Sequence, residues 1–294
     1  MLSLLFYAIR PKTLSVALSV ILLGQLLAWF DLKNISNDQL DLTLAFLCLL
    51  CCLFLQISVN LANDYFDHVA GIDGDDRKGP MRAIQSGALT VDSLKKAIAT
   101  FTLLAMASGS YLIWIGGWVF FLLGNLALAG VFLYSGGKYS LASRSLGEIA
   151  AFLFFGWLGV VGSYYLQVQQ LGWELFIPAS ELGLLIAAIM LVNNIRDIKT
   201  DAAAGKITLA YRLGPNMSRI VYGALLLLPF VLLINNPYLP WFNTLLLPLH
   251  LGFACLIHRR SSEQLNTQLA QTSFLVLTWS LGYLVSFLFG LTMG

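Results

Sequence analysis

Long apolar runs separated by short polar joints repeat along the whole chain. Each run is close to 20 residues long, the length that a helix needs to cross the hydrocarbon core of a bilayer. We predict membrane-spanning helices over nine runs: 14–30, 43–62, 94–114, 118–135, 146–167, 181–197, 218–236, 240–257 and 272–291. Strands of a membrane barrel are about half as long and alternate in polarity, which these runs do not. The pattern therefore predicts an all-α integral membrane protein with a single transmembrane domain over residues 1–294.

The composition excludes a water-soluble globular protein. Hydrophobic residues make up 58% of the chain and charged residues only 11%, whereas about a quarter of the residues in a soluble domain are charged. So few charges cannot cover the surface of a chain of this size, which makes membrane lipid its expected surrounding.

The basic residues predict the orientation in the membrane. When the joints between the nine runs are assigned alternately to the two sides, every Lys and Arg of the 17 except Lys33 falls on the side of the N-terminus. Joints rich in Lys and Arg stay in the cytoplasm. We therefore expect a cytoplasmic N-terminus and a multi-pass protein of the cytoplasmic membrane, with both large charged loops, about 63–93 and 193–217, facing the cytoplasm.

Two acidic clusters follow the second and sixth runs. The first reads NLANDYFDHVAGIDGDDR (residues 60–77) and the second LVNNIRDIKTDAAAGKITLAYRLG (residues 191–214). Asn63 and Asp67 are four residues apart, as are Asn193 and Asp197, so each pair lies on one face of a helix. The matched spacing predicts two pseudo-repeated halves that face each other across a central cavity.

Carboxylates at the end of an apolar helix are costly unless a partner compensates their charge. Hard oxygen ligands with room for water are what Mg²⁺ uses when it is bound mainly through the phosphates of a substrate. Basic residues near both clusters are candidates to contact phosphate oxygens: Lys78, Arg82, Lys138, Lys206 and Arg212. Acids, Mg²⁺ and bases at the mouth of an apolar cavity predict a site for a lipid diphosphate.

At this point the motifs resemble those of a known family. NDYFD with GIDGDDR downstream, and RDIKTD with GKITLAYRLG downstream, are similar to the two aspartate-rich motifs of the UbiA-type membrane prenyltransferases. The resemblance covers the whole chain. RPKTL at 10–14, GPMRAIQSG and GGKYSLASRSLGE are similar to the branch that prenylates 1,4-dihydroxy-2-naphthoate. In the usual first motif an Asp stands where this chain has Gly71, which leaves open whether Asp73 or Asp76 takes that role.

The resemblance implies a reaction and a cofactor. A polyprenyl chain is transferred from polyprenyl diphosphate to 1,4-dihydroxy-2-naphthoate with loss of diphosphate and CO₂, giving demethylmenaquinol in menaquinone biosynthesis at the bacterial cytoplasmic (inner) membrane. The implied Mg²⁺ ligands are Asp67, Asp73, Asp76, Asp197, Asp201 and Asn63. The implied catalytic residues are Asp67, Asp197, Asp201, Asp64 and Lys206. The implied substrate-binding residues are Asn63, Arg82, Lys78, Lys138, Asn193, Arg10, Lys12 and Tyr134.

Two alternatives remain open at this stage. One is another branch of the same superfamily, with 4-hydroxybenzoate or a different aromatic acceptor. The other is an ion-coupled secondary transporter, whose sites lie near the middle of the bilayer. Asn60, Gln56 and Asn125 are the only polar side chains expected to reach that depth, which favours the enzyme. Nucleic acid is not an expected partner.

Overall fold

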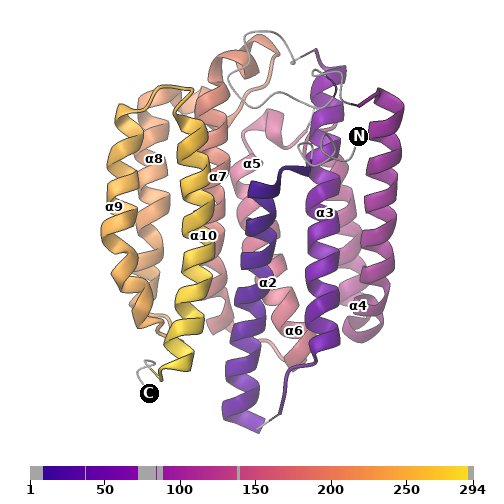
Figure 1. The fold of residues 1–294 in the computed structure, drawn as a ribbon, viewed down its shortest axis with the longest axis vertical. Coiled ribbons are helices and arrows are strands. Elements are labelled where there is room, and N and C mark those ends of the chain that lie inside the picture. Colours follow the sequence, from indigo (N-terminus) through magenta and orange to yellow (C-terminus); the bar gives the residue numbers. More distant parts are fainter. Residues whose placement is uncertain (1–8, 37, 72–83, 85–88, 138–139, 291–294) are drawn as a thin grey trace.

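A computed structural model describes residues 9–36, 38–71, 84, 89–137 and 140–290, apart from the side chains of residues 12, 35 and 36. Within these ranges every regular element is helical and there is no strand. Figure 1 shows the helices running along one common axis. The predicted all-α class is confirmed.

The α-helices have the following bounds: α2 Pro11–Asp31, α3 Leu42–Val69, α4 Val91–Leu133, α5 Gly147–Ala151, α6 Gly162–Val168, α7 Phe176–Ala203, α8 Leu209–Leu233, α9 Leu247–Leu256 and α10 Leu265–Leu288. A π-helical segment, Phe152–Val161, joins α5 to α6. Shorter 3₁₀ or π-helical turns lie at Leu32–Ser36, Ala142–Arg144, Trp173–Leu175, Trp241–Leu246 and Ile257–Arg259. Eight of the described helical segments are long and apolar enough to cross a membrane.

Local chemistry explains where several helices begin. The side chain of Asp41 accepts hydrogen bonds from the backbone N–H groups of Thr43 and Leu44 at the start of α3. Thr90 and Thr208 cap α4 and α8 in the same way. Such side-chain oxygens satisfy backbone donors that have no partner inside the helix. Pro11 occupies the first turn of α2, where its missing N–H costs nothing.

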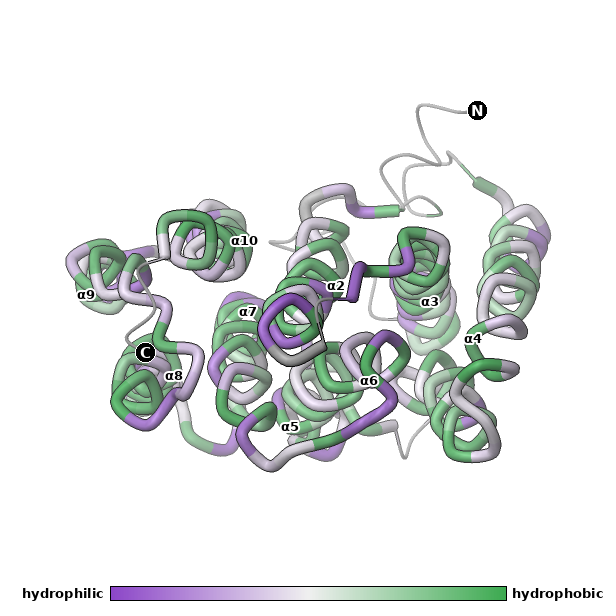
Figure 2. Tube along the Cα trace, turned by 90° about the horizontal axis from the view of Figure 1, so that it is seen from below, coloured by the Kyte–Doolittle hydropathy of each residue, from purple (hydrophilic) through white to green (hydrophobic). Residues whose placement is uncertain are grey.

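Helix α4 contains the predicted span 94–114 and all but the last two residues of the predicted span 118–135. Its backbone leaves helical geometry at Gly117, where φ is 68° and ψ is −158°, a conformation that glycine adopts without strain. In a straight helix, residues 113 and 124 would lie about 16 Å apart along the axis. A methyl group added to Gly124 would instead lie only 3.6 Å from Cδ1 of Ile113. The chain therefore turns back on itself at Gly117, and Figure 2 shows the two limbs of α4.

The helices that carry the second acidic motif and the N-terminal span form the interior of the bundle. In their most apolar windows, 72% of the residues of segment Trp173–Ala203 and 61% of Thr13–Asn34 are buried, against 11% for Val91–Leu133. Figure 2 accordingly shows α2 and α7 between α4 on one side and α8 to α10 on the other. Helix α7 is thus held by neighbours over most of its apolar length.

Candidate active site

The described aspartates of the first acidic motif, Asp64 and Asp67, lie in the last two turns of α3. The helix continues beyond residue 62, where the apolar run ends, to Val69. Asp64 and Asp67 are 2% and 3% exposed. Arg10 donates a hydrogen bond to Oδ1 of Asp64 at 2.5 Å, and Nζ of Lys206 donates to Oδ1 of Asp67. Since Lys206 belongs to the second motif, this ion pair joins the two motifs directly.

The second motif lies in the last turns of α7. Arg196 donates to both carboxylate oxygens of Asp197, at 2.8 and 2.6 Å. The same guanidinium donates to Oδ1 of Asn193 at 2.8 Å. Asp201, one turn further along, is also buried, and its backbone carbonyl accepts from the N–H of Lys206 at 2.8 Å. Asn193 therefore fixes the arginine that neutralises Asp197.

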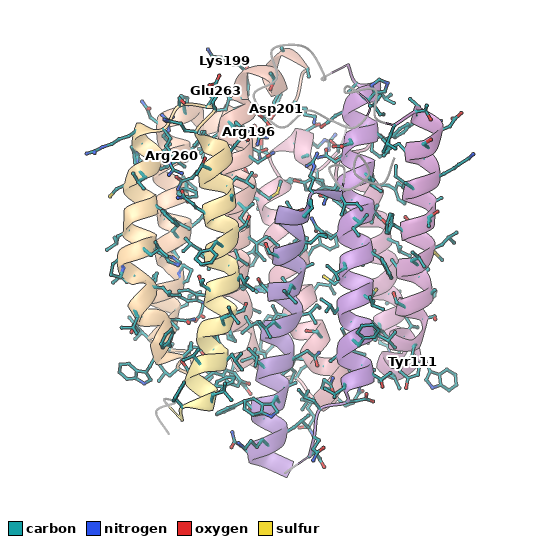
Figure 3. All side chains as sticks on the ribbon, viewed as in Figure 1. Tyr111, Arg196, Lys199, Asp201, Arg260 and Glu263 are labelled. Atoms are coloured by element: carbon teal, nitrogen blue, oxygen red, sulfur yellow. The ribbon has the colours of Figure 1, made fainter. Side chains whose placement is uncertain are left out.

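Arg10 lies within electrostatic reach of acids from both motif helices. Burial lowers the pKa of its guanidinium, but the carboxylates of Asp64, Asp67 and Asp197 raise this pKa by more, so the net direction is upward. Asp64 and Asp67 come from α3 and Asp197 from α7. The charged residues labelled in Figure 3, including Arg196 and Asp201, lie at one end of the bundle. The predicted meeting of the two motifs is thus present in the described residues.

Tyr134 follows α4 and is enclosed by the same charges. Its phenol lies within electrostatic reach of the carboxylates of Glu148, Asp67 and Asp201 and of the guanidinium of Arg10. Its hydroxyl contacts Sδ of Met190 on α7 at 3.7 Å. Tyr134 thus lies beside the acids, one to two turns deeper along α7 than Asp197.

Asn63 faces the end of α4 from the other side. Oδ1 of Asn63 accepts a hydrogen bond from the hydroxyl of Ser135 at 2.9 Å. The amide is thus held beside Asp67 on the inner face of α3, because residues four apart share a helix face. This position agrees with the predicted one, and its predicted part in binding stays a prediction.

The donor chemistry of this site fits Mg²⁺. Asp64, Asp67, Asp197 and Asp201 supply hard oxygen atoms, with no thiolate or imidazole beside them in the contacts described. No group of three such side chains within the described ranges is close enough to hold an ion without further ligands. That agrees with a Mg²⁺ bound through one or two carboxylates and completed by substrate phosphates and water.

Several predicted residues fall outside the described residues: Asp73, Asp76, Lys78, Arg82 and Lys138. The side chain of Lys12 also falls outside them, although its backbone belongs to the first turn of α2. The choice between Asp73 and Asp76 therefore stays open. Arg212 is exposed.

The expectation about deep polar side chains needs correction. Asn60 and Gln56 are buried, as expected, but Asn125 is exposed and donates to the backbone carbonyl of Phe121. Two glutamates that the sequence interpretation passed over are buried instead. Glu148 in α5 is 5% exposed and Glu181 in α7 is 0% exposed. Both stand at the edge of an apolar run, where an acid resembles an ordinary boundary charge.

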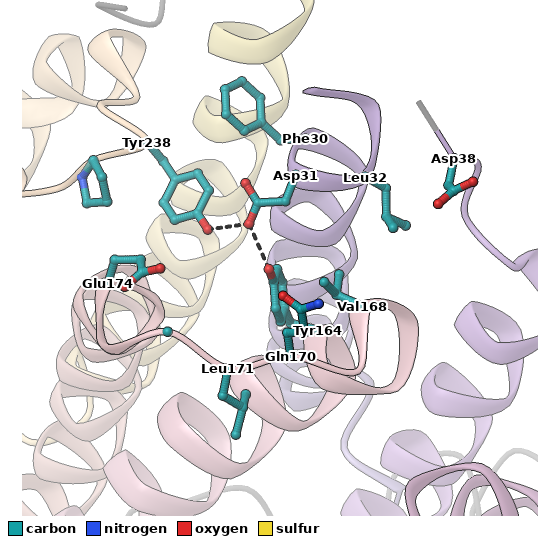
Figure 4. A pocket seen from close by; sticks show the side chains of 12 residues that line it. Phe30, Asp31, Leu32, Asp38, Tyr164, Val168, Gln170, Leu171, Glu174 and Tyr238 are labelled. Atoms are coloured by element: carbon teal, nitrogen blue, oxygen red, sulfur yellow. Dashed lines mark hydrogen bonds between the residues drawn. The ribbon is translucent and has the colours of Figure 1, made fainter. Parts of the chain in front are cut away.

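A cavity of about 480 Å³ lies at the opposite end of the bundle. Figure 4 shows Asp31, whose Oδ2 accepts hydrogen bonds from the hydroxyls of Tyr164 and Tyr238 at 2.8 and 2.7 Å. Asp31 ends α2, about 30 Å along that helix from Pro11. The charged residues that line this cavity are Asp31, Asp38 and Glu174, all acidic. It repels a diphosphate, so we place the anion site at the end that carries Arg10 and Lys206.

Relatives of known activity match most of the chain. The 1,4-dihydroxy-2-naphthoate octaprenyltransferase of Haemophilus influenzae is 36% identical over 293 residues, covering 94% of each chain. The enzyme of that name from Escherichia coli is 38% identical over 226 residues, covering 75% of this chain and 71% of its own. The one from Mycobacterium tuberculosis is 34% identical over 287 residues, covering 96% and 95%.

Solved structures share the fold at low sequence identity. The apo structure of a UbiA homolog from Aeropyrum pernix has a TM-score of 0.71 at 16% identity, covering 94% of this chain and 98% of its own. A UbiA homolog from Archaeoglobus fulgidus bound to GPP and Mg²⁺ has a TM-score of 0.64 at 16% identity, covering 96% and 99%. The model of the UbiA prenyltransferase family matches residues 17–282. The chain therefore belongs to the UbiA prenyltransferase family.

Proposed function

We propose that this protein transfers a polyprenyl chain from polyprenyl diphosphate to 1,4-dihydroxy-2-naphthoate, with loss of diphosphate and CO₂, to give demethylmenaquinol. The acceptor follows from relatives of that named activity at 34–38% identity. The observation that carries the site is the meeting of both acidic motifs around Arg10 and Lys206 at one end of the bundle.

The acids and bases that pair at this end of the bundle suit a substrate whose phosphate groups bind a metal ion. Lys206 holds Asp67, and Arg196 holds Asp197, so both carboxylates are fixed in position. Asp67 and Asp197, with Asp73 or Asp76, would hold Mg²⁺. When bound, the ion would neutralise the diphosphate and make it a better leaving group. Lys206 then turns from Asp67 to the phosphate oxygens, whose charge grows as the allylic C–O bond breaks.

Arg10 is placed to bind the acceptor. Its guanidinium lies at the water-side end of α2 and bonds to Asp64, and a planar guanidinium matches a carboxylate in two-point geometry. We assign it the carboxylate of the aromatic ring, with Asp64 or Asp201 as the group that orients a ring hydroxyl. Tyr134 lines the space between this end and the apolar interior, where the prenyl chain lies.

We further infer nine membrane crossings with a cytoplasmic N-terminus and two related halves. The reversal at Gly117 divides α4 into two limbs, which would raise the eight apolar segments to nine crossings. In Figure 1, α2 begins towards the end of the bundle opposite to that where α10 finishes, as an odd number requires. The packing of α3 on α4 and of α7 on α8 supports the two halves.

Reporter fusions test this topology. We expect a reporter that is active only in the cytoplasm to work when fused before Met1 and to fail after Gly294, and a reporter active only outside to behave in the opposite way. The reason is that nine crossings place the termini on opposite sides. Both termini on the same side would contradict the nine-crossing proposal.

Membranes from cells that overproduce the chain test the reaction. With labelled polyprenyl diphosphate and Mg²⁺, we expect a prenylated lipid and released CO₂ from 1,4-dihydroxy-2-naphthoate and neither from 4-hydroxybenzoate. EDTA should abolish the product and added Mg²⁺ should restore it, because an oxygen-ligand site without its ion cannot neutralise the diphosphate. Use of 4-hydroxybenzoate instead would overturn the acceptor, and product formation in EDTA would overturn the metal site.

A further inference from the structure

Glu148 has a buried carboxylate oxygen that no protein group satisfies. It is the second residue of α5 and is 5% exposed. Its Oε1 accepts a hydrogen bond from Nδ2 of Asn194 on α7 at 2.8 Å. Its Oε2 is buried and has no hydrogen-bond partner among the described residues. A buried acceptor without a partner costs about 1–3 kcal/mol, and more when it is charged.

The free oxygen lies next to the proposed active site, one turn deeper in the bundle. Met190, Asn194, Asp197 and Asp201 are four, three and four residues apart and so share one face of α7. Asn194, the partner of Glu148, is about 4.5 Å below Asp197 along the helix axis. On the α4 side, a methyl group added to Gly147 would come within 3.3 Å of the hydroxyl of Tyr134. Glu148 is therefore bonded to Asn194, and its chain neighbour Gly147 lies beside Tyr134.

Three of the described bases at this end of the bundle are bonded to other acids. Arg10 is bonded to Asp64, Lys206 to Asp67 and Arg196 to Asp197. None of the described side chains donates to Oε2 of Glu148. A second carboxylate group cannot fill that position, because two like charges repel. The partner that fits is a neutral hydrogen-bond donor on a molecule that enters this part of the site.

The acceptor of the proposed reaction carries such a donor. In 1,4-dihydroxy-2-naphthoate the 1-hydroxyl is adjacent to the carboxylate and bonds to it within the molecule. The 4-hydroxyl lies at the far side of the ring and has no internal partner. It needs an acceptor from the protein when it leaves water. With the ring carboxylate on Arg10 at the water-side end, the 4-hydroxyl lies deeper, on the side of Glu148.

We propose that Oε2 of Glu148 accepts a hydrogen bond from the 4-hydroxyl of the aromatic acceptor, and thereby makes the site selective for a ring with this hydroxyl. This inference rests on the proposed function and adds a specificity-determining residue to it. An aromatic acid without the hydroxyl leaves the carboxylate unsatisfied and binds more weakly. Sites built to bond a substrate hydroxyl reject analogues that lack it for this reason.

Equilibrium binding to the purified protein tests the assignment. The two ligands are 1,4-dihydroxy-2-naphthoate and 1-hydroxy-2-naphthoate, which differ only in the 4-hydroxyl, and Mg²⁺ is omitted so that no turnover occurs. In Glu148→Met we expect the affinity for the dihydroxy compound to fall about 10- to 100-fold, the range for a hydrogen bond to a charged group. The affinity for 1-hydroxy-2-naphthoate should change by less than about threefold, since this ligand makes no such bond.

Glu148→Gln keeps the test decisive if the Met variant does not fold. The glutamine carbonyl preserves the bond from Asn194, while the charge on the other atom is lost, so the ratio of the two affinities should fall by a smaller factor. Equal weakening of both ligands would assign Glu148 a structural role between α5 and α7 and overturn the proposal. The proposal would also be overturned if the ratio of the two affinities stayed at its wild-type value in both variants. Failure of the wild-type protein to prenylate 1,4-dihydroxy-2-naphthoate would instead overturn the proposed function.

Discussion

Replacing Asp67 or Asp197 with asparagine will lower the rate of prenyl transfer by roughly 10³-fold, which corresponds to about 4 kcal/mol in activation free energy. Each carboxylate is almost fully buried and stands at the end of its own helix, Asp67 on α3 and Asp197 on α7. An amide has the same shape but no charge, so it cannot hold Mg²⁺ against the diphosphate. It also removes the negative charge that pairs with Lys206 or Arg196.

The rate is measured in membranes with saturating polyprenyl diphosphate and acceptor over a range of Mg²⁺ concentrations. Asp92→Asn is the matched control, because Asp92 is an exposed acid in the first turn of α4 with no contact to the site. We expect it to retain wild-type activity. Either site variant with a rate within tenfold of wild type at high Mg²⁺ would remove that acid from the proposed metal site.

The membrane-spanning helices could be predicted because burial in lipid imposes a simple pattern. The run 43–62 lies within α3, yet the helix extends to Val69. Hydropathy shows only where the side chains become polar. The helix itself continues for as long as its backbone hydrogen bonds form and its polar side chains find partners. Asp64 and Asp67 can be buried in the last turns of α3 because Arg10 and Lys206 form ion pairs with them.

The meeting of the two motifs could also be predicted, since both follow spans that end on the same side of the membrane. The individual pairs could not. Lys206 bonds to Asp67 across 139 residues, although the sequence offers Lys78, Arg82 and Lys138 as nearer candidates. The choice depends on how the segment after α7 lies against the end of α3, and the hydropathy pattern carries no information on that.

The buried glutamates mark the limit of the sequence interpretation. Glu148 and Glu181 each stand next to an apolar run, and their partners are far away in the sequence. Asn194 is 46 residues from Glu148, and Tyr283 is 102 residues from Glu181. A local pattern cannot distinguish an acid that faces water from one that faces three donors in the interior. Only the packing of α5, α7 and α10 does so.

Glu181 is the acid whose removal will cost the most stability. Its Oε1 accepts from Nδ2 of Asn236 at 2.8 Å, and its Oε2 accepts from the indole of Trp279 at 3.2 Å and the hydroxyl of Tyr283 at 2.6 Å. These bonds connect α7 to α10 and to the segment after α8. Glu181→Ala removes the acceptor of Trp279 and Tyr283 and one of the two acceptors of Asn236, and it opens a cavity. We expect the free energy of unfolding to fall by roughly 2–4 kcal/mol.

An SDS titration of the purified protein in mixed micelles measures this free energy. Glu181→Gln should lose less than the alanine variant, because the carbonyl still accepts from Asn236 and the volume is kept. Glu174→Ala is the control, an exposed acid at the same end of the bundle, and should match wild type. Glu181 is 16 residues before Asp197 on α7, about 24 Å along the axis. The folded fraction of the alanine variant should therefore keep its prenyl transfer rate. Wild-type stability in Glu181→Ala would show that lipid or water replaces the carboxylate, whereas lost turnover in fully folded protein would place Glu181 in the reaction itself.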